Sequence, residues 1–358
     1  MAYSYQTNET VETGTRRILS EQVARASNHL SAPTDLETSV HEARKAMKRA
    51  RAALRLVGPV INPKKALKLD AQLCGVGRLL SQTRDFDVMV ATLGNLDKAV
   101  ADRRVLPRVA RQPIQSALAK TISYVRETSM LPAGGATGRG SAEPGPAPAD
   151  VLTHALERLA IARRLVDDIE LPQTSIAVAI RPGLKKTYKA GRHCKNRAEQ
   201  PTRDEDWHTW RKHTQAHWRH MALLRKAWPD WFLARLSVAR QISQYLGQDH
   251  DLYVLKCHLA AMPKGTLAAR GRKQLTAFIE IEQAAHRTHA LRLGHLLYAR
   301  SAKDFVGEVT AYWKQTEAIA QSMATLKGAA SGNRAASGKT ATNSRANGLQ
   351  PCGSQPSA

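Results

Sequence analysis

Residues 41–51 read His-Glu-Ala-Arg-Lys-Ala-Met-Lys-Arg-Ala-Arg and predict an amphipathic helix that runs from about 35 to 57. Apolar residues recur along it at helical spacing and predict its buried stripe, which comprises Val40, Ala43, Met47, Ala50, Leu54 and Val57. Basic residues share the opposite face, namely His41, Arg44, Lys45, Lys48, Arg51 and Arg55. A solvated face usually mixes signs, whereas Glu42 is the only acid between His41 and Arg55. We therefore interpret this face as an anion-binding surface.

The same pattern recurs in the second half of the chain. His208-x-x-Arg211-Lys212 repeats His41-x-x-Arg44-Lys45, and a second signature follows each copy one helix later. That signature is Leu-Ser-Gln-Thr-Arg-Asp-Phe-Asp-Val at 80–88 and Leu-Gly-Gln-Asp-His-Asp-Leu-Tyr-Val at 246–254. The separation from the histidine to the shared aspartate is 44 residues in the first copy and 43 in the second. The recurrence predicts a duplicated unit whose equivalent faces meet at a seam.

Further basic residues accompany the two copies. The second copy is more dilute, with His208, Arg211, Lys212, Gln215 and Arg219 on one face. A third basic stretch follows Pro182 and comprises Lys185, Lys186, Lys189 and Arg192. Arg78, Arg84 and Arg240 lie near the second signatures.

We interpret Asp85 and Asp251 as helix N-caps, each paired with a basic neighbour, rather than as ligands of a cation.

The rest of the sequence also favours helices over strands. Strand alternation is scarce, and two capping boxes, Thr34-x-x-Glu37 and Thr202-x-x-Glu205, precede the two His-x-x-Arg-Lys segments. Pro, Gly and Ala crowd residues 131–149, and Gly, Ser, Ala and Asn dominate the C-terminus. The chain is therefore predicted to be all-α, with helical halves at 10–130 and 150–326, a disordered linker at 131–149 and a disordered tail at 327–358.

Charge points to the class of partner. The 358 residues include 54 Lys and Arg against 30 Asp and Glu, a formal net charge of +24. Such a surface repels itself, and a polyanion relieves that repulsion, so nucleic acid, an anionic membrane and polyphosphate are the candidates. The four cysteines are far apart and the N-terminus has no apolar core of a signal peptide, which predicts reduced thiols in the cytoplasm. No apolar run is long enough to span a membrane.

Catalytic and metal-binding patterns are weak. His213, His217 and His220 fall at i, i+4 and i+7, but no cysteine or carboxylate follows at metal spacing. Proton donor, phosphate ligand and cap residue all remain open for His41 and His208. We find no nucleotide-binding glycine motif and no nucleophile-base pattern, so we predict no catalytic residue, no metal and no cofactor.

The sequence at 41–51, the Arg84-Asp85-Phe86-Asp87-Val88 signature and the diluted second copy resemble the CHAD family, the conserved histidine α-helical domain. The resemblance covers about residues 10–325. It implies two pseudo-symmetric four-helix bundles around a basic central cleft, polyphosphate binding and, in bacteria, association with polyphosphate granules. Some members carry a fused CYTH triphosphatase domain, but its E-x-E-x-K motif is not found here, so that activity is not implied.

The leading hypothesis is therefore a non-enzymatic polyphosphate-binding protein. A nucleic-acid-binding protein is the alternative, although the basic face of the 35–57 helix has no aromatic residue for base stacking. An enzyme of phosphate metabolism that uses His41 or His208 is a third possibility. The predicted polyphosphate-binding residues are His41, Arg44, Lys45, Lys48, Arg51, Arg55, Arg78, Arg84, Lys185, Lys186, Lys189, Arg192, His208, Arg211, Lys212, Arg219 and Arg240.

Overall fold

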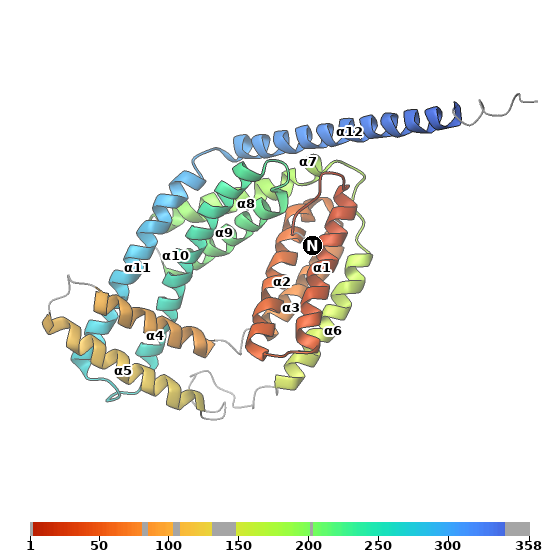
Figure 1. Ribbon diagram of the computed structural model, residues 1–358. Coiled ribbons are helices and arrows are strands. Elements are labelled where there is room, and N and C mark those ends of the chain that lie inside the picture. The colour runs from red at the N-terminus through yellow and green to blue at the C-terminus, as the bar shows by residue number, and fades with distance from the viewer. Residues whose placement is uncertain (1–2, 81–84, 103–107, 131–147, 201–202, 341–358) are drawn as a thin grey trace, which may run out of the picture.

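The protein is all-α, as predicted (Figure 1). The computed structural model describes residues 3–80, 85–102, 108–130, 148–200 and 203–340, and these contain no β-strand. The helices are α1 (Val11–Ser31), α2 (Leu36–Val57), α3 (Pro63–Leu79), α4 (Asp85–Asp102), α5 (Arg108–Met130), α6 (Pro148–Asp167), α7 (Ile176–Ala179), α8 (Arg181–Ala198), α9 (Asp204–Leu224), α10 (Pro229–Ala261), α11 (Ala269–Leu297) and α12 (Ala302–Thr340), with a short 3-10 turn, η1 (Gly58–Val60), after α2.

The larger of two hydrophobic cores joins both halves of the sequence. Helices α1, α2, α3 and α6 pack together, and α8, α9 and the beginning of α10 continue the same core. All six apolar positions predicted for the buried stripe of α2 are buried, which confirms that prediction. Trp210, Tyr188 and Trp313 are fully buried, so these aromatic side chains stabilise the core rather than line a binding surface.

The smaller core lies at the other end of the molecule. Helices α4 and α5 pack against the second half of α10 and the first half of α11, through residues such as Leu93, Leu118, Leu255 and Leu275. The two cores therefore do not correspond to the two predicted halves, 10–130 and 150–326. Helices α4 and α5 contact helices of the second half, while α6 contacts α1 and α3. The twofold relation between two bundles stays a prediction.

Helix α10 contradicts one predicted N-cap. It is continuous from Pro229 to Ala261, so Asp251 lies in its interior and is not the N-cap that we expected. Helix α2 begins where predicted, but its cap is the Asp35 carboxylate, which accepts a hydrogen bond from the backbone N–H of Thr38. Helix α9 begins after Arg203 without a side-chain cap, and Thr202 lies outside the described residues.

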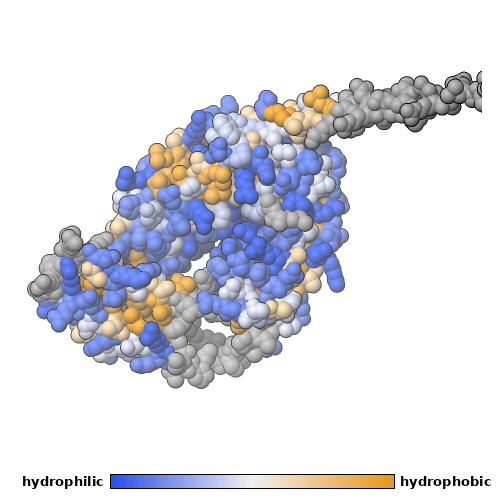
Figure 2. Space-filling model, viewed as in Figure 1, coloured by the Kyte–Doolittle hydropathy of each residue, from blue (hydrophilic) through white to orange (hydrophobic). Residues whose placement is uncertain are grey.

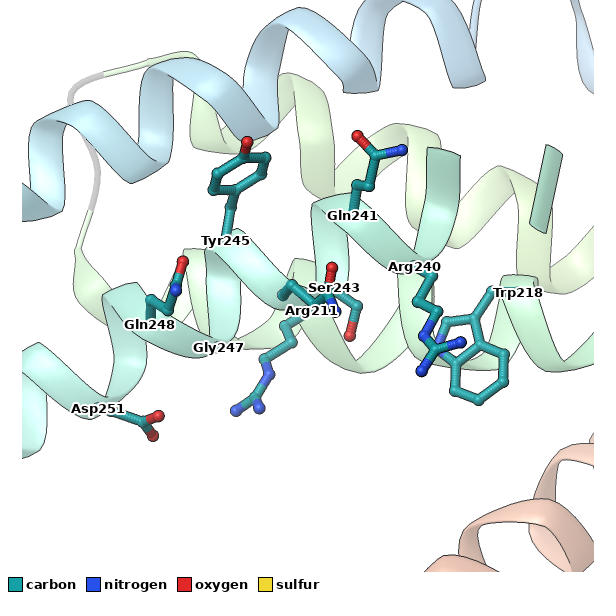
Figure 3. A pocket seen from close by; sticks show the side chains of 10 residues that line it. Arg211, Trp218, Arg240, Gln241, Ser243, Tyr245, Gly247, Gln248 and Asp251 are labelled. Carbon is teal, nitrogen blue, oxygen red and sulfur yellow. The ribbon is translucent and has the colours of Figure 1, made fainter. Parts of the chain in front are cut away.

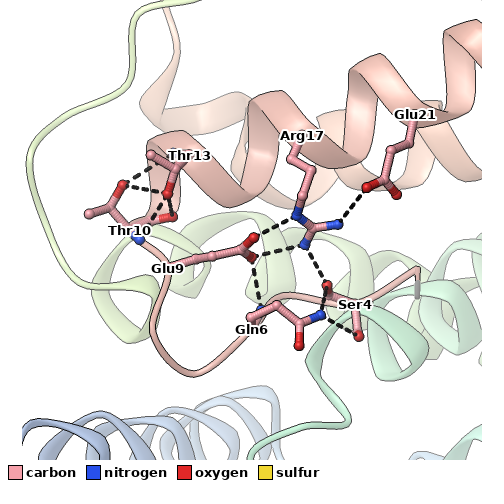
Figure 4. A network of polar contacts seen from close by, with 7 residues as sticks. All are labelled: Ser4, Gln6, Glu9, Thr10, Thr13, Arg17 and Glu21. Atoms are coloured by element: carbon pink, nitrogen blue, oxygen red, sulfur yellow. Dashed lines mark hydrogen bonds and ion pairs between the residues drawn. The ribbon is translucent and has the colours of Figure 1, made fainter. Parts of the chain in front are cut away.

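The N-terminal segment belongs to the fold, although the first half was predicted to begin at residue 10. Tyr5 is fully buried, and its backbone N–H donates to the carbonyl of Leu223 at the end of α9. Arg17 holds the segment in place, since its guanidinium contacts the carboxylate of Glu9 at 2.5 Å and the carbonyl of Ser4 at 2.9 Å (Figure 4).

Two further predictions concern the linker and the tail. Residues 131–147 of the predicted linker lie outside the described part, and α6 begins at Pro148. Helix α12 projects from the body and continues through 327–340, where we predicted a disordered tail (Figure 1). The alanines in this stretch favour helix despite its glycines, which explains the difference. Within the described residues, no helix is both long and apolar enough to cross a membrane.

Candidate functional site

The two sequence copies meet where α9 and α8 lie against the second half of α2. His220 Nε2 of α9 is 3.0 Å from the backbone carbonyl of Ala52 in α2. On α8, Gly183 approaches α2 so closely that a Cβ there would lie 1.9 Å from the carbonyl oxygen of Leu56 and 2.7 Å from that of Arg55. This contact brings the basic end of α2 next to α8 and α9, and we call this meeting of the two sequence copies the seam.

Arginines cluster at this seam, and we call Arg49, Arg55, Arg211 and Arg219 the seam arginines. Arg219 is only 7% exposed, and its guanidinium lies 4.2 Å from the ring centre of Trp218. Burial lowers the pKa of Arg219 to about 10; nearby Tyr3 raises it, and the like charges of the other three seam arginines lower it further. Charges that repel one another in partly dehydrated surroundings favour an anion between them.

The second copy also shapes a groove beside the seam (Figure 3). Arg211, Trp218, Arg240, Ser243 and Asp251 are among the residues that line this cavity of about 640 Å³. The side chains of Arg211, Arg240 and Asp251 project to the same side of α10. The groove therefore offers two guanidinium groups and one carboxylate to a ligand.

Equivalent arginines occupy similar places in the two copies. Arg44 donates to the carbonyl of Leu80 at 2.8 Å, near the end of α3. Arg211 lies over Gly247, where a Cβ would come within 3.0 Å of its Nη2. Leu80 begins the first signature and Gly247 is the second residue of the other, so the repeat is visible in the contacts as well as in the sequence.

Ion pairs separate the predicted cations into two groups. Lys45 contacts Glu42 at 2.7 Å, Arg51 forms a two-point contact with Asp70 at 2.8 and 3.0 Å, and Lys212 lies 3.9 Å from Glu205. Within the described residues, no carboxylate lies within 4.0 Å of the other group, which comprises Arg55, Lys185, Lys186, Lys189, Arg192, Arg211, Arg219 and Arg240. The same holds for Arg49, which was not among the predicted residues. This second group is the better candidate for binding an anion, because a ligand need not displace an internal carboxylate.

Several predicted residues lie around this group. His41 is half-buried on α2, and Lys48 and Arg78 are exposed. Arg192 donates to the carbonyl of Arg300 at 3.4 Å, on the side of α8 near α12. Arg84 lies outside the described residues. Figure 2 shows a hollow between the helices of the larger core and those of the smaller core, with mainly hydrophilic residues around it.

The sequence matches the model of one known protein family over both repeat copies. The family model of the CHAD domain matches residues 17–260, which is more than half of the chain. This chain belongs to the CHAD family. The match runs from α1 to the end of α10 and includes both His-x-x-Arg-Lys segments and both signatures. It is shorter at both ends than the resemblance that we traced over 10–325.

Other comparisons add little to the CHAD assignment. Among solved structures, this CHAD protein is similar to PptA from Streptomyces chartreusis, with 14% sequence identity and a TM-score of 0.47. The likeness covers 81% of this chain and 98% of that chain. A search of curated proteins finds no significant match.

The histidine that recurs in this CHAD domain is half-buried beside a second histidine in the second copy. The rings of His208 and His250 lie 4.2 Å apart, tilted by 30°. Burial, followed by the charges of His250 and Lys212, lowers the pKa of His208 to about 4. His208 is therefore neutral near pH 7 and does not add a cation to the unliganded surface. Within the described residues, no group of three potential metal ligands lies close together.

Sequence reasoning missed two residues at this CHAD site, Arg49 and Trp218. Arg49 falls off the face shared by His41 and Arg55, so helical periodicity assigned it elsewhere, and Trp218 was not among the predicted binding residues. Arg49 reaches the seam because the N-terminal segment packs over it, with the Tyr3 hydroxyl donating to its carbonyl at 2.8 Å. No sequence signal indicates this long-range contact.

The free energy of unfolding is expected to fall as the pH is lowered from about 6.5 toward 4. Burial lowers the pKa of His220 to about 4 and that of His217 well below 6.5, whereas unfolded histidine titrates near 6.5. Between these values the unfolded chain binds protons that the folded chain does not. Each such histidine therefore removes up to about 1.4 kcal/mol per pH unit. Urea unfolding at neutral pH and at mildly acidic pH measures the slope.

A control with added salt separates the contribution of the buried histidines to this pH dependence from that of repulsion between surface charges. Added salt screens repulsion among exposed charges but leaves the slope of a buried histidine in place. A His220→Gln variant should show a shallower slope. Glu42, whose pKa Lys45 and then Arg25 lower to about 2, affects stability below about pH 4.5, so the slope between pH 6.5 and 4.5 reports the histidines and not this carboxylate. Stability that stays constant or rises on acidification would contradict the account.

Proposed function

We propose that this CHAD protein binds inorganic polyphosphate, without catalysing a reaction on it, through the surface where α2, α8, α9 and α10 meet. The observation that carries the proposal is the cluster of seam arginines. Among the described residues, Arg55, Arg211 and Arg219 approach one another from both sequence copies without a carboxylate partner. Family membership supports the choice of polyphosphate over other anions. The place in the cell that we propose is the cytoplasm, at polyphosphate granules.

The length of the surface suits a linear ligand. From His41 to Arg55, α2 rises about 21 Å at 1.5 Å per residue. Lys185, Lys186 and Lys189 are exposed on α8, which begins beside the end of α2. Each charge-assisted contact with a phosphate oxygen contributes on the order of 1.5–3 kcal/mol. A few such contacts along one chain are enough for tight binding.

Nucleic acid is the second candidate, and Trp218 is the observation that favours it. Its indole lines the groove beside Arg211 and Arg240, and aromatic rings in cationic grooves stack on bases. Against it, the exposed basic residues of α2 are accompanied by no aromatic side chain. Polyphosphate requires only the cations, which are the larger part of the surface.

A competition experiment with the full chain separates the two ligands. Labelled single-stranded and duplex DNA are bound first, and long-chain polyphosphate is then added at constant salt. We expect polyphosphate to displace both at a lower concentration of phosphate units than unlabelled DNA requires. If DNA displaces polyphosphate more readily than the reverse, the nucleic-acid function is favoured instead. Constant salt is essential because the affinity for either ligand falls steeply as the salt concentration rises.

A second measurement tests the absence of catalysis. Purified protein is incubated with polyphosphate, with and without divalent cations, and released phosphate is measured. We expect no release above background. Release that a His41→Ala variant abolishes would instead show an enzyme that uses this histidine.

A further inference from the structure

An apolar ridge runs along the part of α12 that leaves the body. Ile319, Met323 and Leu326 are 59%, 55% and 70% exposed and follow one another at helical spacing of four and three residues. The ridge begins at Tyr312, whose ring meets the 47% exposed Trp228 edge-on at 4.9 Å. From Tyr312 to Leu326 it is about 21 Å long. Figure 2 shows apolar residues at this place on α12.

The body does not cover this ridge. Trp313 and Thr316 hold α12 in place by donating to the carbonyls of Leu224 and Ala227, both at 3.1 Å. One turn further on, Ala320 and Ala324 face the N-terminal segment across a shallow pocket. The ridge lies on a different side of the helix, because Ile319 is offset by about 100° from Ala320 and Met323 by about 100° from Ala324.

Charge is unevenly distributed between the ridge and the rest of the molecule. Residues 318–326 read Ala-Ile-Ala-Gln-Ser-Met-Ala-Thr-Leu and contain no charged side chain, in a chain of net charge +24. Small residues flank the ridge on both sides. Two helices of this kind can approach closely without repulsion, and apolar residues at alternating spacings of three and four are the pattern of paired helices.

We propose that two copies of this chain pair through this ridge, with their α12 helices antiparallel and Ile319 near the twofold axis. Leu326 of one copy then covers Tyr312 and Trp228 of the other, and the contact is repeated by symmetry. Antiparallel pairing places the two cationic bodies at opposite ends of the helix pair, whereas parallel pairing brings them side by side.

The chemistry of the ridge distinguishes a second copy from the other possible occupants. Helices that lie on anionic membranes carry several lysines and arginines beside their apolar face. Between Tyr312 and Leu326 the only such residue is Lys314, which falls on the opposite side of the helix from Ile319, and Lys327 follows the ridge. An acidic protein partner would be attracted to the cationic body rather than to this uncharged segment. A second copy matches the ridge in apolar character, length and lack of charge.

Sedimentation velocity of the full chain, over a wide range of protein concentration and without polyphosphate, tests the proposal. We expect a monomer–dimer equilibrium in the native chain. Ile319→Glu should raise the dissociation constant by at least about a hundredfold, because symmetry places the substitution twice in the interface. The matched control is Thr325→Glu, which adds the same charge to an exposed position of α12 away from the ridge and should leave the dimer unchanged.

Cross-linking tests the orientation of the helices. In a chain whose four native cysteines are replaced by serine, Ile319→Cys should form a disulfide between copies under mild oxidation, whereas Leu326→Cys should not. Efficient cross-linking at both positions would overturn the antiparallel arrangement. A native chain that stays monomeric throughout, a dimer that survives Ile319→Glu, or vesicle binding by 318–326 would each overturn the proposal. None of these outcomes bears on polyphosphate binding, so the two proposals fail separately.

Discussion

Replacing Arg55 and Arg211 together by glutamate is expected to weaken polyphosphate binding by at least about a hundredfold. The two side chains come from different sequence copies, and neither has a carboxylate partner within the described residues. Each substitution removes a contact of on the order of 1.5–3 kcal/mol and places an anion beside the ligand. Isothermal titration with long-chain polyphosphate at constant salt measures the change.

The fold should tolerate these substitutions, since Arg55 is exposed and Arg211 is half-buried at the groove. Circular dichroism and urea unfolding of the variant check this. The matched control is Lys98→Glu with Lys120→Glu, which changes the net charge equally on exposed positions of α4 and α5. That control should reduce affinity by much less, through long-range electrostatics alone. Equal losses in the two variants would mean that net charge, not the seam, binds the ligand.

Gly183→Ala is expected to lower the free energy of unfolding by about 3 kcal/mol. A Cβ at this position would lie 1.9 Å from the carbonyl oxygen of Leu56 and 2.6 Å from its carbonyl carbon. These are backbone atoms of a buried helix, so α8 and α2 must move apart to relieve the overlap, and overpacked positions of this kind are costly. Urea unfolding measures the loss.

Gly77→Ala is the control for this substitution. Gly77 lies inside α3, and no atom apart from its chain neighbours and the adjacent backbone of α3 lies within 4 Å of the position that its Cβ would occupy. Alanine there should stabilise the helix by about 0.5–1 kcal/mol. If Gly183→Ala has an equally small effect, α8 does not contact α2 as closely as described, and the seam arginines lose the packing that brings them together.

Local patterns of the sequence predicted the helices well. Spacing of three and four residues identified the buried face of α2, and Val40, Met47 and Leu54 are buried as expected. The duplicated His-x-x-Arg-Lys segments identified the two helices that meet at the seam. Such features depend on neighbours along one helix, which a single sequence displays directly.

Long-range packing was not predictable in the same way. Nothing in residues 85–130 indicates that α4 and α5 pack on α10 and α11, because an apolar face does not specify its partner. Glycine is unfavourable inside a helix, yet α10 continues through Gly247, and the missing Cβ gives room to the guanidinium of Arg211. The ion pair between Arg51 and Asp70 joins α2 to α3 across 19 positions, so the sequence did not show that this arginine is already paired.

The most direct test of the central claim is a titration of the native full chain with long-chain polyphosphate at near-physiological salt. We predict saturable binding, with a dissociation constant that the Arg55→Glu and Arg211→Glu substitutions raise and the Lys98→Glu and Lys120→Glu substitutions largely preserve. Absence of binding by the native chain under these conditions would contradict the proposed function.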